Sequence, residues 1–115
     1  MEVQTKVFKA FCDTKRLNII ELLQRGEMCA CELLEELNMA QSTLSYHMNV
    51  LVESGVVDSR QEGKWTYYKM SQEGIDFAIE QLQSITINDM PRVHNNSCQV
   101  SYRKQDTSVK MERQK

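Results

Sequence analysis

The chain has 115 residues with a formal net charge of −2; 26% of the residues are charged and 41% are hydrophobic. This length provides one domain with a single hydrophobic core. No apolar run approaches the roughly 18 residues of a membrane-spanning helix, and the N-terminal residues lack an apolar signal core, so we expect a cytoplasmic protein without a membrane partner. The low content of proline and glycine, together with the lack of a Gly-rich phosphate loop or a G-x-S-x-G elbow, disfavours a loop-rich β fold and an ordinary metabolic enzyme.

The charges are distributed unevenly along the chain. Residues 1–85 contain 8 Lys/Arg and 13 Asp/Glu, a balance of −5, whereas residues 86–115 contain 6 Lys/Arg and 3 Asp/Glu, a balance of +3. Because the second segment is also polar and aperiodic, we interpret it as a basic, disordered tail that follows one folded domain. Affinity for phosphates increases with clustered cations, so an acidic domain is not expected to bind nucleic acid non-specifically, and any contact with DNA must come from a few well-placed residues.

Apolar residues recur at helical spacing in the first half of the domain. The first predicted helix is short and carries Val7, Phe8 and Phe11 on its apolar stripe. The second is capped by Asp13 and ended by Gly26. The third covers residues 31–37, and the fourth covers residues 41–54 and is closed by Gly55. Only three residues separate the third helix from the fourth, which is typical of a helix-turn-helix.

A change to β-forming residues follows the fourth helix. Residues 56–61 and 65–70 predict a β-hairpin with its tip at Glu62-Gly63, and Ser71 then caps a last helix. A hairpin directly after the second helix of a helix-turn-helix fits a wing. The predicted fold is therefore mainly α with a small β-hairpin, a winged helix-turn-helix.

Three segments of the sequence together resemble a known family. They are FKAFCDTKRLNIIELL, CACELLEELNMAQSTLSYHMNVLVESGVV and RQEGKWTYYKMS, and in order and spacing they resemble the ArsR/SmtB winged-helix metalloregulators over residues 5–85. The C-A-C-E-L segment at residues 29–33 is similar to the cysteine box of the arsenic-sensing branch. The resemblance implies a homodimeric repressor that leaves operator DNA when a metal or metalloid binds.

The chain departs from the family pattern at three places. Leu34 occupies the position where arsenic sensors of this branch often have a third cysteine. The last helix contains Asp76 but no histidine, which disfavours the zinc site found on that helix in other members. Ala40 replaces the usual serine before the recognition helix, and a poor N-cap costs on the order of 1 kcal/mol unless the helix starts one turn later on Ser42.

The fourth helix is the candidate reading element for double-stranded operator DNA. Its first two turns carry short polar or amphipathic side chains of the kind that meets base edges in the major groove. The candidate DNA contacts on this helix are Gln41, Ser42, Thr43, Ser45, Tyr46 and His47. The helix contains no Lys or Arg, which leaves open the alternative of a winged-helix protein-interaction module that binds no DNA.

Cations near the hairpin tip extend the candidate DNA-binding face. Arg60 and Lys64 flank the tip, and a cation there can enter a minor groove. The alternative is an ordinary charged hairpin in which Arg60 stacks on Trp65. Lys15 and Arg16, at the start of the second helix, are either phosphate contacts or solvated side chains.

Cys29 and Cys31 are the candidate ligands of a trivalent arsenic or antimony effector. Soft thiolates suit soft ions, and the start of the third helix stabilises thiolates. On a regular helix, side chains two residues apart diverge by about 200° around the axis, so we expect chelation to distort the first turn of the third helix. The alternative is one cysteine buried as a small apolar residue and the other inert. No catalytic cofactor is expected.

The sequence allows three options for the third ligand of this arsenic or antimony site. Cys12 is one candidate, although it is equally well interpreted as a buried core thiol, and Cys98 in the tail is another. A site of two thiolates completed by water or by an external thiol is a third option. A redox switch is the rival function, and we expect its disulfide to use Cys12 or Cys98, because two cysteines this close form a strained pair.

The first and last helices are predicted to form a homodimer interface. Val7, Phe8 and Phe11, together with Ile75, Ile79 and Leu82, provide more apolar surface than one small core absorbs. The alternative is that they only complete the core of the monomer. Two recognition helices spaced by about 34–36 Å require a two-fold dimer, which favours the interface.

Overall fold

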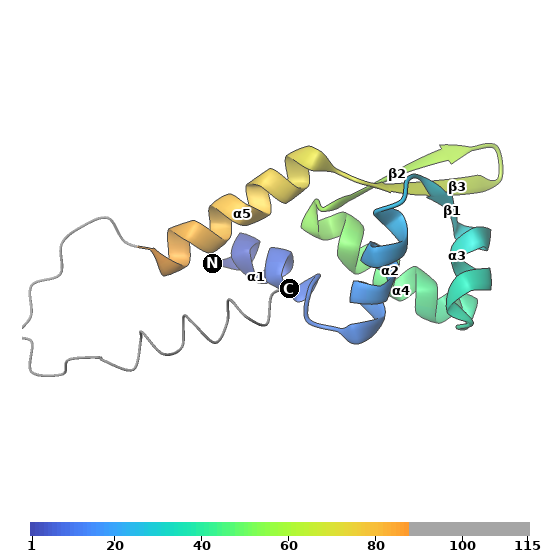
Figure 1. The fold of residues 1–115 in the computed structure, drawn as a ribbon, viewed down its shortest axis with the longest axis horizontal. Coiled ribbons are helices and arrows are strands. Elements are labelled where there is room, and N and C mark those ends of the chain that lie inside the picture. Colours follow the sequence, from blue (N-terminus) through green and yellow to red (C-terminus); the bar gives the residue numbers. More distant parts are fainter. Residues whose placement is uncertain (88–115) are drawn as a thin grey trace, which may run out of the picture.

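The computed structural model of the chain describes residues 1–87, and residues 88–115 of the predicted tail lie outside the described residues. The elements in chain order are α1 (Glu2–Lys9), α2 (Thr14–Leu23), β1 (Met28–Cys29), α3 (Ala30–Leu37), α4 (Gln41–Ser54), β2 (Val57–Glu62), β3 (Trp65–Met70) and α5 (Gln72–Thr86). Figure 1 shows α1 and α5 at one end of the molecule and the β2–β3 hairpin with α3 at the other. The predicted mainly helical fold with a small hairpin is confirmed.

Local capping sets several of the predicted helix boundaries, although α2 ends at Leu23, before the predicted Gly26, and α4 begins after Ala40 without a side-chain cap. The Asp13 carboxylate accepts a hydrogen bond of 2.7 Å from the backbone N–H of Lys15 and begins α2. The Ser71 hydroxyl accepts one of 3.0 Å from the N–H of Gly74 and begins α5. Helix α4 ends at Gly55, whose φ of +92° lies in the left-handed region that glycine adopts without strain.

The hairpin belongs to a sheet of three antiparallel strands in the order β1-β3-β2. Glu62 pairs with Trp65, so the turn lies at Gly63-Lys64, one residue later than predicted. Strand β1 was not expected from the sequence: Met28 pairs with Tyr68 and Cys29 with Tyr67. The two residues of β1 are too few to show the alternation by which a strand is recognised.

The hydrophobic core lies between α2, α4 and the base of the wing. Its fully buried side chains include Ile19, Leu23, Leu33, Met48, Leu51, Val56 and Val57, and α1 adds Val7 and Ala10. Phe11 lies beyond the end of α1 and remains 38% exposed. Helix α3 packs mainly against α2, β1 and β3. Within residues 1–87, no helix has both the length and the apolar character that a bilayer span requires.

The first turn of α5 lies against the C-terminus of α4 at two glycines. A Cβ atom on Gly74 would overlap the carbonyl oxygen of Gly55 and lie 3.0 Å from the Cα of Val56. The backbone N–H of Ser71 donates a 2.9 Å hydrogen bond to the carbonyl of Val56 beside this contact. Because the obstacle is backbone, a side chain at position 74 requires the two helices to separate.

We therefore expect Gly74→Ala to destabilise the domain by about 1–3 kcal/mol or more, in spite of the higher helix propensity of alanine. Urea unfolding followed by circular dichroism measures the change, with the exposed Glu80→Ala on the same helix as the matched control. A Gly74→Ala variant as stable as Glu80→Ala would show that the close approach of the two helices is not required.

Candidate thiol site and nucleic-acid interface

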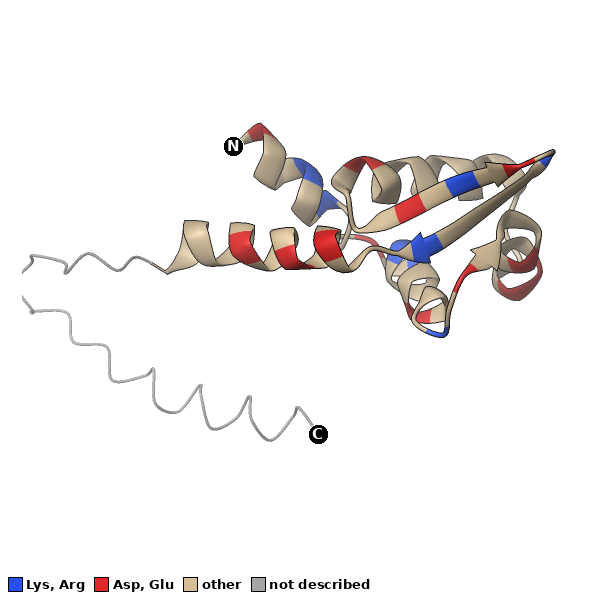
Figure 2. Cartoon of the chain, turned by 90° about the horizontal axis from the view of Figure 1, so that it is seen from above, with Lys and Arg blue, Asp and Glu red and all other residues tan. Residues whose placement is uncertain are grey.

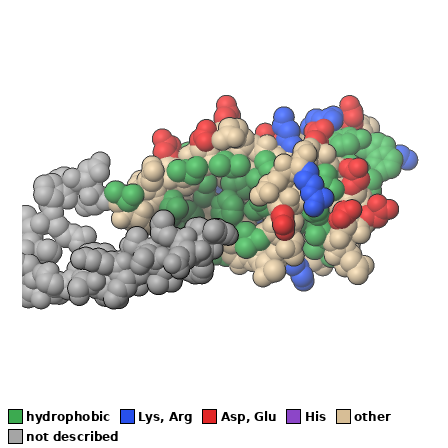
Figure 3. Space-filling model, viewed as in Figure 1, with side chains coloured by type: hydrophobic (Ala, Val, Ile, Leu, Met, Phe, Trp, Pro, Cys, Tyr) green, Lys and Arg blue, Asp and Glu red, His purple; other side chains and the backbone are tan. Residues whose placement is uncertain are grey.

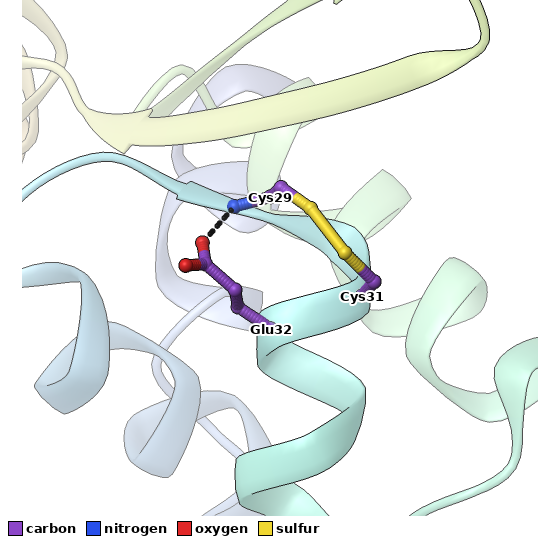
Figure 4. Close-up of a disulfide and its surroundings, with 3 residues drawn as sticks. All are labelled: Cys29, Cys31 and Glu32. Atoms are coloured by element: carbon purple, nitrogen blue, oxygen red, sulfur yellow. Dashed lines mark hydrogen bonds between the residues drawn. A yellow bond between two sulfur atoms is a disulfide. The ribbon is translucent and has the colours of Figure 1, made fainter.

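Cys29 and Cys31 bring their sulfur atoms together at the start of α3. Cys29 is the N-cap residue and has extended backbone angles (φ −86°, ψ 157°), whereas Cys31 lies in the first helical turn. The two sulfurs are joined in a disulfide, with the Cα atoms 5.4 Å apart (Figure 4). The expectation that the side chains diverge by about 200° is wrong, because Cys29 precedes the helix. Chelation therefore does not require α3 to unwind.

Two backbone interactions hold Cys29 in place. Cys29 pairs with Tyr67 across the sheet, and its backbone N–H donates a 2.8 Å hydrogen bond to the Glu32 carboxylate (Figure 4). The Cys29 side chain is buried, whereas Cys31 is exposed. The expectation that an oxidised cysteine of this pair would join Cys12 or Cys98 is also wrong, since the two cysteines pair with one another.

Cys12 lies in the turn between α1 and α2 as a free, exposed thiol, so the interpretation as a buried core thiol is wrong. Helix α2 separates it from β1, and ten helical residues span about 15 Å. Within residues 1–87, no three His, Cys, Asp or Glu side chains cluster in a way that could hold a metal ion. Among the described residues of one subunit, two sulfurs thus converge at this site, and Cys98 lies outside the described residues.

The reduced pair fits an ion that takes soft sulfur ligands. Two thiolates that reach one point without rearrangement of the backbone suit trivalent arsenic or antimony, which are soft ions. The metal ligand is a thiolate, and the oxidised pair contains none. Ligation therefore requires the disulfide to be reduced first.

The candidate DNA contacts of α4 divide between two faces of the helix. Gln41, Ser42, Ser45 and Tyr46 are exposed, and Thr43 is half-buried. These residues form a polar face on the first two turns, which is what a recognition helix presents to base edges. His47 lies on the opposite, buried face.

His47 is part of a buried pair with Arg16. An Arg16 Nη1–H donates to His47 Nδ1 at 2.8 Å, and Arg16 Nη2 donates to the carbonyl of Lys9 at 3.0 Å. Only 6% of His47 and 5% of Arg16 is exposed. The pair therefore joins α4 to α2 and to the end of α1. This geometry makes both residues positioning groups, in contrast to the direct DNA contacts considered from the sequence.

Burial of the ring lowers the pKa of His47 below its ordinary value of 6.5, against the opposing effect of the Asp13 carboxylate. As the pH falls through 6.5, the unfolded chain takes up a proton that the folded protein resists. The unfolded state then binds more protons, so stability is present above pH 6.5 and is lost on acidification.

We expect the urea midpoint of the wild-type protein to fall more between pH 7.5 and pH 5.5 than that of His47→Asn. Asparagine retains an acceptor for Arg16 but does not titrate. Parallel unfolding curves over this pH interval provide the measurement. If both proteins show the same pH dependence, the buried imidazole does not contribute to it.

Arg60 is tied to the loop before β1. Its Nε and Nη2 each donate to the Glu27 carboxylate at 3.0 Å, and its Nη1 lies 3.2 Å from Glu62. The guanidinium also lies over the ring of Tyr67, 4.5 Å from the centroid, whereas Trp65 was the partner considered from the sequence. The hydrogen bond from Arg60 lowers the pKa of the Glu27 carboxyl. This pair connects the wing to the strand that carries Cys29.

Lys64 differs from Arg60 because it projects from the tip of the wing. It is exposed and has no ion-pair partner among the described residues. Lys64 lies in the turn between the paired residues Glu62 and Trp65, and Figure 2 shows a basic position at the far end of the hairpin, whereas acidic positions follow α5 and α3. Of the two cations that flank the tip, Lys64 is therefore the one that is free to meet a phosphate.

These elements define a winged helix-turn-helix regulator, in which α3 and α4 form the helix-turn-helix and β2–β3 the wing. Residues 13–59 match the model of the arsR family of bacterial regulatory proteins. The chain is 39% identical over 83 residues to an arsenical resistance operon repressor of Staphylococcus xylosus, covering 72% of this chain and 80% of that protein. The chain therefore belongs to the arsR family of bacterial regulatory proteins.

Two further comparisons agree with this assignment. An uncharacterized HTH-type transcriptional regulator of Methanocaldococcus jannaschii is 39% identical over 80 residues, which cover 69% of this chain and 90% of that protein. The solved structure of HlyU from Vibrio cholerae N16961 matches with a TM-score of 0.59 at 29% identity, covering 76% of this chain and 95% of that one. The relatives are transcriptional regulators, so the prediction of a repressor rather than an enzyme is confirmed.

Proposed function

We propose that this chain is a homodimeric repressor that leaves its operator DNA when trivalent arsenic or antimony binds Cys29 and Cys31. The observation that carries the proposal is the convergence of both sulfurs at the N-terminus of α3, inside the helix-turn-helix. The name of the Staphylococcus xylosus relative, an arsenical resistance operon repressor, supports the same effector.

The DNA-binding face combines the polar side of α4 with the tip of the wing. Gln41, Ser42, Ser45 and Tyr46 are exposed on the helix, and Lys64 is exposed on the wing. The alternative of a protein-interaction module is less well supported, since the relatives are repressors and HTH-type regulators.

The sheet provides the route from the thiols to the DNA-binding face. Cys29 is paired with Tyr67 of β3, and Arg60 of β2 holds Glu27, two residues before Cys29. A change in the position of the Cys29 sulfur therefore acts on the wing through backbone pairing. Helix α3 packs mainly against α2 and the sheet, so a direct push of α3 on α4 is not the main route.

An apolar groove between α1 and α5 supports the homodimer. Phe8, Phe11, Ile75, Ala78, Ile79 and Leu82 line it. Figure 3 shows apolar side chains exposed over these helices, and about half of the Ile79 and Leu82 surface is accessible. A second copy that covers this face would place two recognition helices for two operator half-sites.

A thiol redox switch is the second candidate function, because the structure holds Cys29 and Cys31 as a disulfide. In this reaction, peroxide is reduced to water while the two thiols lose two protons and two electrons and form the S–S bond. The two candidates differ in the agent that releases the protein from DNA.

The decisive experiment is arsenite titration of the complex between the reduced protein and its upstream DNA. We expect a loss of DNA affinity of about 5–150-fold, the range typical of allosteric coupling. Cys29→Ser should abolish release while leaving DNA binding intact, and Cys12→Ser, at the exposed thiol remote from the pair, is the matched control. Equal release from wild type and Cys29→Ser would remove the pair from the mechanism. Release by peroxide alone would favour the redox switch.

The wing is tested separately through the salt dependence of DNA binding. We expect Lys64→Ala to reduce the slope of affinity against salt by about one phosphate contact on all sequences. Lys69→Ala, which removes the same charge near the base of the hairpin, is the control and should change the slope less. Identical slopes for both variants would indicate that the tip of the wing points away from DNA.

A further inference from the structure

A groove opens beside the thiol pair, between α3 and the wing. Cys29, Cys31, Glu32, Trp65 and Tyr67 line one part of it, which has a volume of about 250 Å³. The adjoining part is lined by Leu34, Gln41, Lys64 and Thr66 in addition to the two cysteines, Ala30 and Trp65. The groove thus leads from the sulfurs to two candidate DNA contacts, Gln41 on α4 and Lys64 on the wing.

The register of the sheet explains why aromatic rings face the sulfurs. Cys29 is paired with Tyr67, so the two side chains lie on the same face of the sheet. Trp65 is two residues before Tyr67 on β3 and shares this face. The indole is 48% exposed, so one side of it is available to a ligand in the groove.

The position of Leu34 decides what a third ligand can be. Leu34 is three residues after Cys31, on the same side of α3, and it lines the groove. An apolar side chain therefore stands where a third sulfur would complete a three-thiolate site. The Glu32 carboxylate in the groove accepts the hydrogen bond from the Cys29 N–H, and the described residues hold no group of three His, Cys, Asp or Glu that could bind a metal ion.

We propose that the preferred effector is a trivalent arsenical that carries one carbon substituent, with this substituent lying in the groove against Trp65 and Leu34. The proposal rests on the proposed function and specifies its ligand. Such an arsenical has only two exchangeable positions, which matches two thiols, and its third position is already filled by carbon. A cavity of about 150 Å³ holds benzene, so the groove has room for a phenyl group.

The binding reaction is a ligand exchange without oxidation or reduction of arsenic. Each of the two Cys–SH groups loses its proton, and two As–S bonds replace the two As–OH bonds of R–As(OH)₂. The two hydroxyl groups leave as two molecules of water, while the As–C bond stays intact. The disulfide is first opened by a phosphine reductant, which takes up the oxygen of water as it reduces the S–S bond to two thiols.

The experiment measures the affinities of arsenite and phenylarsonous acid for the full-length, phosphine-reduced protein by calorimetry. A dithiol reductant is avoided because it would compete for arsenic. A pair of thiols by itself binds arsenite and phenylarsonous acid with different affinities. The quantity compared between wild type and Trp65→Ala is therefore the ratio of the affinity for phenylarsonous acid to the affinity for arsenite. Cys29→Ser is the control for binding at other thiols. Trp65 is the only tryptophan of the chain, so its fluorescence in the wild type reports occupancy of the groove.

We expect Trp65→Ala to lower the ratio of the phenylarsonous acid affinity to the arsenite affinity by about tenfold or more, because an apolar contact supplies discrimination of this size. The affinity for arsenite itself should be unchanged. Leu34→Cys should raise the affinity for arsenite and so lower the ratio of the phenylarsonous acid affinity to the arsenite affinity. This variant tests the proposal even if Trp65→Ala fails to fold. Equal ratios in wild type and Trp65→Ala, or a wild type that prefers arsenite, would overturn this inference and leave the proposed function intact. Binding of neither compound to the reduced pair would overturn both.

Discussion

The antiparallel pairing of Met28–Cys29 with Tyr67–Tyr68 is the interaction on which the site depends. It holds Cys29 extended at the N-terminus of α3, and this conformation lets its sulfur reach that of Cys31. The same pairing places the sulfurs beside the wing, because β3 also pairs with β2. Without β1, the two cysteines would lie on successive faces of a helix and would have no common ligand.

The helices and the hairpin could be predicted from the sequence because local chemistry sets their ends. Asp13, Gly55 and Ser71 cap α2, α4 and α5 through contacts with residues next to them in the chain. Strand β1 could not be predicted, since its two residues become a strand only by pairing with a segment about forty residues later. The conformation of Cys29 was missed for the same reason.

The sequence predicted the exposed part of the DNA-binding face but not the role of every residue in it. His47 is three residues after Leu44 and four before Leu51, both buried, so helical periodicity already placed it on the inner face of α4. Its partner Arg16 lies 31 residues away, and no local pattern joins them. Likewise, Arg60 is separated from Glu27 by 33 residues, so its ion pair appears only when the wing folds onto the loop before β1.

The contact between Gly55 and Gly74 has a mechanical consequence for recognition of DNA. It joins the end of the recognition helix to the start of α5 through backbone atoms, with no side chain between them to act as a flexible spacer. In the proposed dimer, α5 lies in the interface, so each reading element is attached to that interface through backbone contacts. The separation between operator half-sites is then a fixed dimension of the protein, and an operator lengthened by a single base pair must bend or twist to be bound.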